Sequence, residues 1–236
     1  GGTVAYALLS AVACAQYPSK PVRFVVPYTP GGGTDLMARA LAQRLTENMG
    51  QSFVVENRAG AGGNLGMEFV ARAAPDGYTI ALALTAQYVV NPALYPKLPY
   101  DPVKDYAPIM LVARNPYVLI VHPTVPAKTL KELLALAKAR AGQLTFSSSG
   151  NGSGAHLSGE MLKTLGKVNM LHIPYKGAGA LLPDLIAGQV HLSFVTWSSV
   201  GPHVKSGRLR ALGVTTVKRS PALPELPAIA ETLPGY

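Results

Sequence analysis

Short apolar runs alternate with longer stretches of mixed polarity along most of the chain, and glycine-rich turns often separate the two. Each run has the length of a strand, and several of the stretches that follow have helical spacing. The order of strand, turn and helix, repeated, predicts an α/β fold with a largely parallel sheet. The expected strands cover residues 22–27, 51–56, 78–84, 117–121, 144–148, 169–173, 190–195 and 209–214, with a further apolar run at 109–113.

A proline-rich segment interrupts this rhythm near the middle of the chain. Residues 91–108 contain five prolines, which is too many for a helix and suits a crossover between domains. We therefore expect a first α/β domain at residues 16–100 and a second α/β domain at 101–225. A tail at 226–236 is expected to return toward the first domain.

Two features of the second domain concern helix boundaries. Thr129 and Glu132 have the spacing of a capping box, which predicts that a helix begins there. Pro183 lies within the stretch 177–188, where it should kink a helix or begin a new one.

The first residues have the character of an export signal. Residues 4–15 form an uncharged apolar run that is too short to span a bilayer but matches a signal-peptide core, and they end in Ala13-Cys14-Ala15. We therefore expect residues 1–15 to be a signal-peptide remnant and the protein to be periplasmic (extracytoplasmic). A first helix of the domain is the alternative, although the run has no polar face. Cys14, the only cysteine, would be removed with the signal or carry a lipid anchor.

The composition indicates a globular protein with a basic surface. Hydrophobic residues make up 48% of the chain and charged residues 14%, so there is enough apolar material for a core. The formal net charge is +9, yet the basic residues are scattered singly and only Lys218 and Arg219 are adjacent. The charge suits nucleic acid, an anionic membrane surface or small anionic ligands, and the scatter disfavours the first of these.

The chain shows no familiar catalytic or metal-binding pattern. Neither H-E-x-x-H nor G-x-S-x-G occurs, and the only cysteine lies in the expected signal. His156 and Glu160 are four residues apart on one expected helix face, but two ligands do not make a metal site. We expect no enzymatic activity, no metal and no cofactor.

Two glycine-rich loops carry the strongest functional signal. Residues 31–35 (GGGTD) and 149–154 (SGNGSG) each follow an expected strand and open an expected helix. The first amides of a helix lack partners and carry partial positive charge, and glycine lets a ligand approach them, so such loops bind anions. An ordinary tight turn, with Thr34, Asp35 or Ser153 as a cap, is the alternative for each loop. Two loops in separate domains favour one anion held between the domains.

One of these loops also allows a different interpretation. Gly150, Gly152 and Ala155 match the dinucleotide fingerprint G-x-G-x-x-G/A, so a dinucleotide-binding enzyme is the runner-up. The acidic residue required about 20 positions later is missing from residues 173–176. Lys176 in that segment could meet a 2′-phosphate, and the interpretation therefore stays open.

Several motifs together resemble one known family. They are residues 17–23 (YPSKPVR), 26–35 (VPYTPGGGTD), 57–64 (NRAGAGGN), 75–78 (PDGY) and 152–157 (GSGAHL). These motifs resemble the Bug-type periplasmic substrate-binding receptors of tripartite tricarboxylate transporters, and the resemblance spans residues 17–236. It implies a periplasmic-binding-protein type II-like fold, with two βα domains that close like a Venus flytrap around a ligand cleft. It also implies a C-terminal part beyond Tyr236, a small mono- or dicarboxylate ligand, and membrane permease subunits as partners. We expect a monomer.

The same resemblance implies where the ligand lies. The carboxylate would meet backbone amides of the loop 28–35, faced by residues 149–156, with residues 85–87 and Thr196 at the sides. Asp35 should mainly hold its loop through amide hydrogen bonds. The expected ligand-binding residues are Tyr28, Thr29, Pro30, Gly31, Gly32, Gly33, Thr34, Asp35, Thr85, Ala86, Gln87, Ser149, Gly150, Ser153, His156 and Thr196. Which carboxylate binds, and whether the protein delivers it to a permease or only senses it, stay open.

Overall fold

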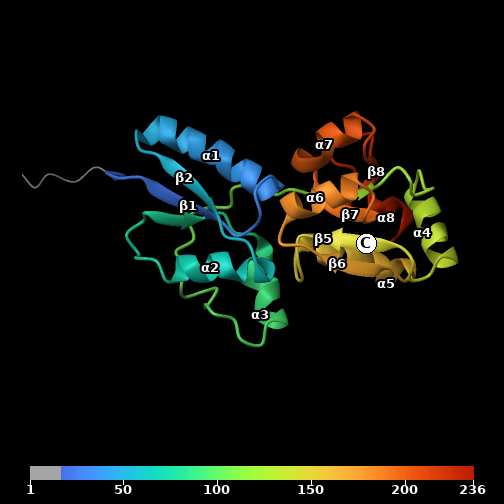
Figure 1. The fold of residues 1–236 in the computed structure, drawn as a ribbon, viewed down its shortest axis with the longest axis horizontal. Coiled ribbons are helices and arrows are strands. Elements are labelled where there is room, and N and C mark those ends of the chain that lie inside the picture. The colour runs from blue at the N-terminus through green and yellow to red at the C-terminus, as the bar shows by residue number, and fades with distance from the viewer. Residues whose placement is uncertain (1–16) are drawn as a thin grey trace, which may run out of the picture.

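The chain folds around two separate sheets, each with its own hydrophobic core. The computed structural model describes residues 17–236, so the expected signal-peptide remnant at 1–15, with Cys14, lies outside the described residues. The two sheets lie side by side along the long axis of the molecule (Figure 1). The predicted α/β fold with two βα units is therefore confirmed.

The first unit is built on a short parallel sheet. Its strands β1 (Val22–Val26), β2 (Phe53–Asn57) and β3 (Thr79–Ala81) lie in the order β2-β1-β3, and β1 pairs in parallel with both neighbours. Helix α1 (Gly33–Met49) covers one face and α2 (Asn64–Ala71) the other (Figure 1). Parallel pairing requires a crossover between strands, and these two helices supply it.

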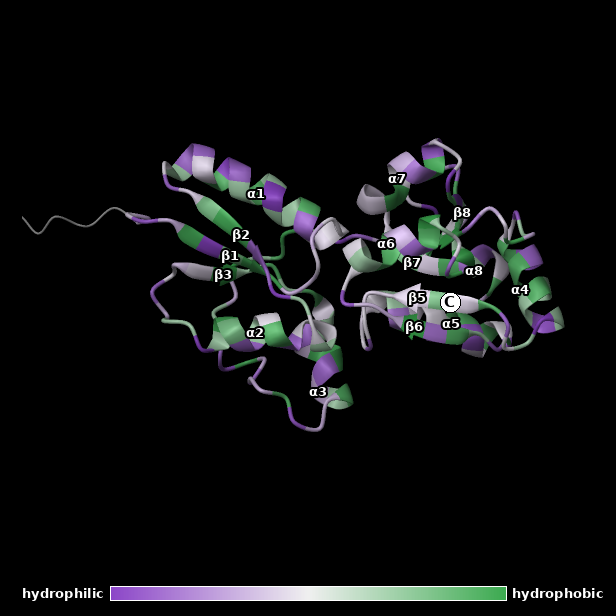
Figure 2. Ribbon diagram, in the orientation of Figure 1, coloured by the Kyte–Doolittle hydropathy of each residue, from purple (hydrophilic) through white to green (hydrophobic). Residues whose placement is uncertain are grey.

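Shorter helical turns complete the first unit. A 3-10 turn, η1 (Ala61–Gly63), precedes α2, while a π-helical turn, η2 (Ala86–Val90), and α3 (Asn91–Leu94) follow β3. Alternate apolar residues of β1, among them Val22 and Phe24, pack against Ala38 and Ala42 of α1. Small side chains on α1 let the helix approach the sheet closely, and its outer face is polar (Figure 2).

The second unit has a mixed sheet in the order β6-β5-β7-β4-β8. Its strands are β4 (Tyr117–Val121), β5 (Thr145–Ser148), β6 (Leu171–Pro174), β7 (Leu192–Thr196) and β8 (Arg210–Val214). β5 pairs in parallel with β6 and β7, whereas β4 runs antiparallel to β7 and β8. The prediction of a largely parallel sheet is wrong for β4, because this strand follows the crossover segment and not a strand-helix repeat.

Both faces of the second sheet are covered by helices. The helices are α4 (Leu130–Ala139), α5 (Gly154–Gly166), α6 (Ala178–Ile186), α7 (Trp197–Lys205) and α8 (Ile229–Thr232). On β4, Leu119 and Val121 face a core shared with α4, α5 and α8, while Val118 and Ile120 face a core shared with α6 and α7. The period of two along this buried strand thus supplies apolar side chains to both cores.

Two predicted helix features can be located. The Thr129 hydroxyl accepts the Glu132 N–H at 3.2 Å, so the predicted cap is confirmed, although the Glu132 carboxylate accepts the N–H of Lys128 (2.7 Å) and not that of Thr129. Pro183 lies inside α6, which begins at Ala178, so it does not begin a new helix.

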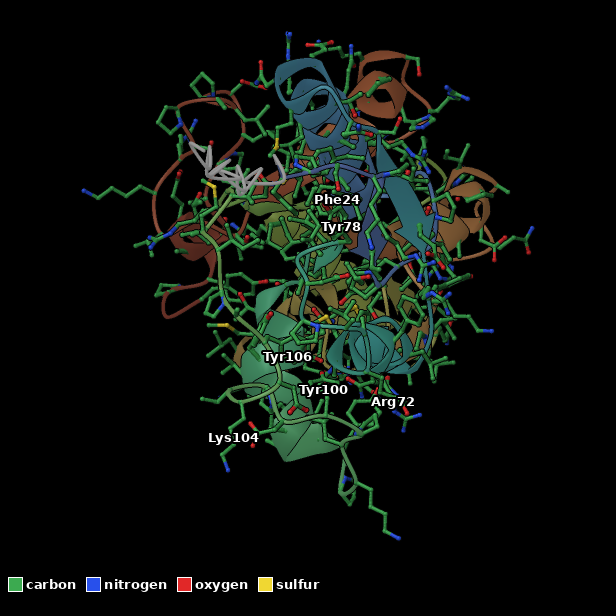
Figure 3. The ribbon with its side chains drawn as sticks, turned by 90° about the vertical axis from the view of Figure 1, so that its left-hand side faces the viewer. Phe24, Arg72, Tyr78, Tyr100, Lys104 and Tyr106 are labelled. Atoms are coloured by element: carbon green, nitrogen blue, oxygen red, sulfur yellow. The ribbon has the colours of Figure 1, made fainter. Side chains whose placement is uncertain are left out.

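The segment between the two units differs from the prediction. Tyr106 donates its hydroxyl to Met67 O (2.9 Å) and Tyr100 donates to Asn64 Oδ1 (2.9 Å), so residues 101–106 pack on the first unit, beside α2 and α3 (Figure 3). A boundary after residue 100 is therefore too early. The apolar run at 109–113 forms no strand, since no strand within residues 17–236 pairs with it, and Ile109 is 79% exposed.

The tail also departs from the prediction. Residues 226–236 do not return to the first unit: Ile229 is buried in the core that contains Leu119, and the Tyr236 hydroxyl donates to Ser158 O at 3.0 Å. Val214 forms a parallel bridge with Ala228, which holds the tail against β8. The apolar side chains of the tail are buried against the nearest exposed part of the core of the second unit.

Candidate functional site

The first glycine loop is held in shape by one buried carboxylate. Asp35, only 2% exposed, accepts the Gly31 N–H (3.0 Å) and the Arg39 Nε–H (2.9 Å) at one oxygen, and the Asn57 amide (2.9 Å) at the other. Burial raises the pKa of Asp35, but the hydrogen bonds from Arg39, Gly31 and Asn57 outweigh it and hold the pKa below its ordinary value. Both oxygens are occupied, so Asp35 shapes the loop and does not line the cavity described next.

A small cavity of about 40 Å³ lies where the two units meet. Its walls come from the first glycine loop, the end of β3, the start of β4, the ends of β5 and β7, and the beginning of α6. The lining residues are Tyr28, Gly32, Gly33, Thr34, Leu84, Tyr117, Ser149, Ala178, Leu181, Phe194, Val195 and Thr196. None of these side chains carries a formal charge at neutral pH.

Three helices begin at this cavity, and none of them is capped by the side chain of its own N-cap residue. The N-cap residues are Gly32 for α1, Gly177 for α6 and Thr196 for α7, and none of the three makes a side-chain capping hydrogen bond. The unpaired amides of a helix N-terminus and the helix dipole favour negative charge. The cavity is therefore electropositive although it contains no cation.

The units touch closely beside the cavity because glycines line the contact. Thr29 donates its N–H to Lys176 O (3.4 Å), and its hydroxyl accepts the Ala180 N–H (3.2 Å). A Cβ on Gly179 would overlap Pro30 O, and a Cβ on Gly33 would overlap the Thr196 hydroxyl. Thr29 and Pro30 thus serve the contact between the units, whereas Gly31 is exposed and held by Asp35; none of the three lines the cavity, and their assignment to the ligand stays a prediction.

The second glycine loop contributes less than expected. Ser149 lines the cavity, but Gly150, Ser153 and His156 do not. The Ser153 hydroxyl caps α5 by accepting the His156 N–H at 3.2 Å, and His156 Nδ1 accepts the Gly152 N–H at 3.1 Å. The Gly152 and His156 amides are therefore satisfied within the loop, and the assignment of Gly150, Ser153 and His156 to the ligand stays a prediction.

The same loop makes a second contact with the first unit. A Cβ on Gly150 would lie 3.6 Å from Gly62 Cα, and one on Gly152 would lie 2.8 Å from Leu94 Cδ1. The glycines that match a dinucleotide fingerprint pack against the first unit. The geometry therefore gives the dinucleotide interpretation no support.

The remaining expected residues divide between the cavity and its supports. Thr196 lines the cavity, and its hydroxyl lies 3.2 Å from that of Ser198. Thr85, Ala86 and Gln87 do not line it: Thr85 is exposed, while Ala86 and Gln87 are buried behind the wall.

Sequence reasoning missed one wall residue of the first unit, Leu84, and much of the wall that the second unit provides. The missed residues are Leu84, Tyr117, Ala178, Leu181, Phe194 and Val195. A signal for part of this wall was present, because residues 176–180 (KGAGA) form a third glycine-rich loop between a strand and a helix. Tyr117 stands at the start of an ordinary apolar strand, and nothing in its sequence context marks it.

Two stacked histidines lie behind the second loop. The rings of His156 and His172 are 4.2 Å apart, and His172 Nε2 lies 2.7 Å from the Ser148 hydroxyl. Burial lowers the pKa of His156, and burial together with His156 lowers the pKa of His172 to about 4. Both imidazoles are therefore neutral at pH 7. Within residues 17–236 no three His, Cys, Asp or Glu side chains gather closely enough to hold a metal ion.

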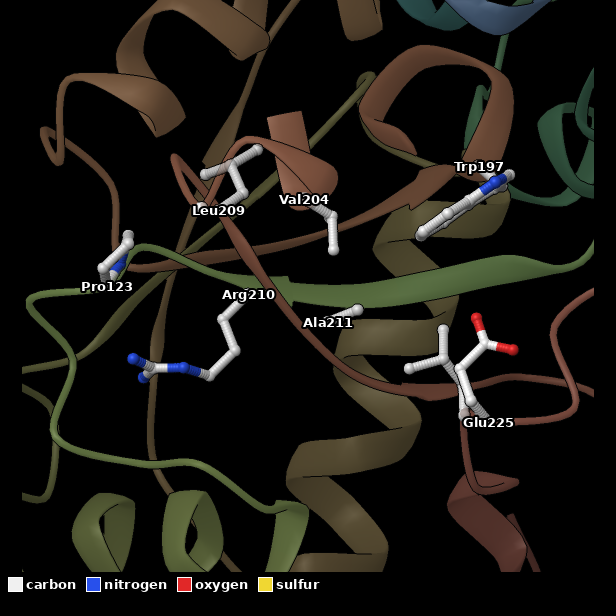
Figure 4. A pocket seen from close by; sticks show the side chains of 9 residues that line it. Pro123, Trp197, Val204, Leu209, Arg210, Ala211 and Glu225 are labelled. Carbon is white, nitrogen blue, oxygen red and sulfur yellow. The ribbon is translucent and has the colours of Figure 1, made fainter. Parts of the chain in front are cut away.

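A larger hollow, of about 340 Å³, opens on the surface of the second unit (Figure 4). Trp197, Leu209 and Glu225 contribute to its wall, and neither glycine loop reaches it. The Arg210 guanidinium at its edge donates to Ala127 O at 2.9 Å, so its charge is engaged. In the stretch 17–236, no helix has the length and apolar character needed to cross a membrane.

The fold and the cavity define an α/β binding protein in which two units enclose a small electropositive space. The chain belongs to the tripartite tricarboxylate transporter family receptors, whose family model matches residues 37–235. It is 41% identical over 228 residues to the protein BugT of Bordetella pertussis, covering 95% of this chain and 69% of that protein. It is 40% identical over 222 residues to a UPF0065 protein from the tcbD-tcbE intergenic region of a Pseudomonas species. This match covers 93% of this chain and 66% of that relative.

Solved structures agree with this assignment. The R. palustris protein Rpa4515 with adipate superposes with a TM-score of 0.91 at 40% identity, over 93% of this chain and 74% of that one. The periplasmic binding protein BugD superposes with a TM-score of 0.88 at 40% identity, over 93% of this chain and 73% of that one. MatC from Rhodopseudomonas palustris with bound malate superposes with a TM-score of 0.85 at 32% identity, over 92% of this chain and 74% of that one. The predicted Bug-type family and fold class are confirmed.

Proposed function

We propose that this protein is a periplasmic receptor that binds a small carboxylate in the cavity between its two units and delivers it to the membrane subunits of a tripartite transporter. The observation that carries the proposal is the cavity without charged side chains at the N-termini of α1, α6 and α7, whose N-cap residues make no side-chain capping hydrogen bond. Relatives solved with adipate and with malate support a dicarboxylate as the ligand class. Capture and release, without turnover, is the activity we infer.

The energetics of such a site suit a moderate affinity. Each helix terminus contributes about 0.3–1 kcal/mol toward an anion, and up to roughly 2 when partly buried, so three termini supply at most about 6 kcal/mol. A micromolar complex needs about 8 kcal/mol. Hydrogen bonds from the hydroxyls of Tyr28, Tyr117 and Thr196 to a charged acceptor can supply the remainder.

The size of the cavity sets a condition on binding. A space of about 40 Å³ corresponds to about three water molecules at roughly 10–15 Å³ each, which is enough for one carboxylate group. A dicarboxylate therefore requires the units to stand further apart than they do here. We infer that its second carboxylate is received as the contact around Thr29 and Ala180 opens.

A ligand screen tests the proposal on the full chain. Thermal unfolding is measured with adipate, malate, short monocarboxylates and inorganic phosphate, and with the neutral diamide of adipate as the matched control. A ligand that binds only the folded state raises the melting temperature, and titration calorimetry then gives the dissociation constant. We expect a dicarboxylate to stabilise the protein and the diamide to have no effect. Equal stabilisation by the diamide, or none by any carboxylate, would contradict the proposal.

A further inference from the structure

The hydrogen bonding of one hydroxyl in the cavity wall, that of Tyr28, is set by the side chain of Gln87 behind it. Tyr28 is 4% exposed and lines the cavity directly after β1. Its hydroxyl oxygen accepts a hydrogen bond from Gln87 Nε2 at 2.7 Å, and within residues 17–236 this is the only hydrogen bond that the hydroxyl makes. The phenolic proton therefore remains available on the cavity side.

The orientation of the Gln87 amide is fixed by two backbone groups. Gln87 is fully buried; its Oε1 accepts the Leu84 N–H (2.8 Å), and its Nε2 donates to Gly62 O (2.8 Å) as well as to Tyr28. A flipped amide would place oxygen against Gly62 O and nitrogen against the Leu84 N–H, and both contacts would be repulsive. The nitrogen must face Tyr28, so the Tyr28 oxygen must accept.

The glycine loop 60–63 provides the space for this amide. A Cβ on Gly63 would overlap Gln87 Nε2, and Gly60, Gly62 and Gly63 all have positive φ angles. The loop therefore brings the Gly62 carbonyl to the amide and leaves room for it. This gives the NRAGAGG motif, which does not reach the cavity, a role in the site.

We propose that Gln87 is a positioning residue that makes Tyr28 an obligatory hydrogen-bond donor to the ligand, so that the site selects groups that only accept, such as an ionised carboxylate, over amides and protonated acids. The inference rests on the proposed carboxylate function. Burial keeps the pKa of Tyr28 well above its ordinary value, so the phenol keeps its proton at every pH at which the protein would act.

A substitution that reverses the polarity of this contact tests the proposal. In Gln87→Glu, one carboxylate oxygen can still accept the Leu84 N–H; the other is repelled by Gly62 O and faces the Tyr28 hydroxyl, whose proton it captures. Tyr28 is then no longer a donor to the ligand. The matched control is Gln143→Glu, which makes the same chemical change at an exposed position of the second unit.

The experiment is a double-mutant cycle read by titration calorimetry with the dicarboxylate that binds best in the screen. Tyr28→Phe should weaken binding by about 10- to 100-fold in the wild-type background, as expected for a hydrogen bond to a charged group. In the Gln87→Glu background the same change should alter affinity less than about 2-fold, because the donor is already lost. Gln143→Glu should leave the full effect of Tyr28→Phe in place. If Gln87→Glu does not fold, Gln87→Met is used in the same cycle: it removes the N–H without accepting the Tyr28 proton, so the Tyr28→Phe effect should be reduced but not abolished, and an undiminished effect would overturn the inference.

A pH series distinguishes positioning from a structural defect. The ratio of the dissociation constants of Gln87→Glu and wild type should fall toward one between pH 8 and pH 5, since a protonated carboxyl can again donate to Tyr28. The titratable groups in contact with Gln87 are Tyr28 and Tyr100, whose pKa values are raised, that of Tyr100 to about 12, so neither titrates in this range. A constant ratio, or a Tyr28→Phe effect of equal size in both backgrounds, would overturn the inference while leaving the receptor function intact. Failure of wild type to bind any carboxylate would overturn both.

Discussion

The two glycine loops, 31–35 and 149–154, share a sequence signature but have different roles. The first opens α1 with Gly32 as an N-cap that makes no side-chain hydrogen bond, and it lines the cavity. The second opens α5 with Ser153, whose hydroxyl caps the helix, and its glycines rest on the other unit. An anion site needs free amides as well as glycine, and Ser153 occupies one of the amides at the start of α5.

Valine at Gly32 should have the largest effect on binding. A Cβ there would lie 3.2 Å from Ala178 Cβ, and φ is −80°, so the added bulk narrows the cavity without straining the backbone. Gly32→Val should weaken carboxylate binding by about 10- to 100-fold, measured by calorimetry, and lower the free energy of unfolding by about 1–3 kcal/mol, because Ala178 and Gly179 must shift. Normal affinity in a folded Gly32→Val variant would remove the first loop from the site.

Alanine at Asp35 should chiefly affect stability. The carboxylate accepts three hydrogen bonds from groups of the first unit, so Asp35→Ala should lower the free energy of unfolding by about 2 kcal/mol in urea titrations. Affinity, measured well below the melting temperature, should change less than about 3-fold, in keeping with a wall that Asp35 does not line. A stable variant without binding would assign Asp35 to the ligand after all.

The variant Ser153→Ala tests whether the Ser153 hydroxyl caps α5 or contacts the ligand. Ser153→Ala removes the cap of α5 and should cost about 1 kcal/mol of stability with unchanged affinity. Thr129→Ala removes the matching cap of α4, far from the cavity, and should behave alike. A loss of affinity seen with Ser153→Ala alone would restore the second loop to the binding site.

As the pH falls, stability should be lost at the second glycine loop at a higher pH than at the first. Burial lowers the pKa of His172 to about 4, so its contribution to stability is complete above the unfolded value of 6.5 and is lost as the pH falls toward 4. Allowing for solvent screening, the loss at pH 5 should be below about 1 kcal/mol. Asp35, with a lowered pKa, does not titrate in this window. Urea titrations at pH 7 and pH 5 should show the loss in wild type and a smaller one in His172→Gln.

Much of the fold follows from local pattern, and the failures have a common cause. The strands of both sheets were predictable because each is a short apolar run bounded by turn residues. The apolar run at 109–113 looks the same in sequence, but a strand also needs a neighbour, and within residues 17–236 it has none. The direction of β4 and the return of the tail to the second core likewise depend on which partner is nearest, which periodicity does not encode.

The site was predictable as far as it consists of backbone. Glycine before a helix marks Gly32 and Gly33 as places where a ligand reaches amides, and both line the cavity. Gln87 was expected to touch the ligand, whereas its hydrogen bonds hold Tyr28. Such a role requires knowing the positions of Leu84 and Gly62, which come together only in the folded chain.

The hydrogen bonds of Thr29 to Lys176 and Ala180 have a kinetic consequence. They join the units without any ligand, and we expect a dicarboxylate, which is too large for the cavity as it stands, to bind only during the fraction of time in which this contact is broken. The association rate constant should fall below the diffusion limit in proportion to that fraction. Thr29→Val, which deletes the hydroxyl that Ala180 contacts, should speed association in stopped-flow mixing. The hydrogen bonds of Thr29 would then govern the rate at which the receptor binds its ligand, separately from its affinity for that ligand.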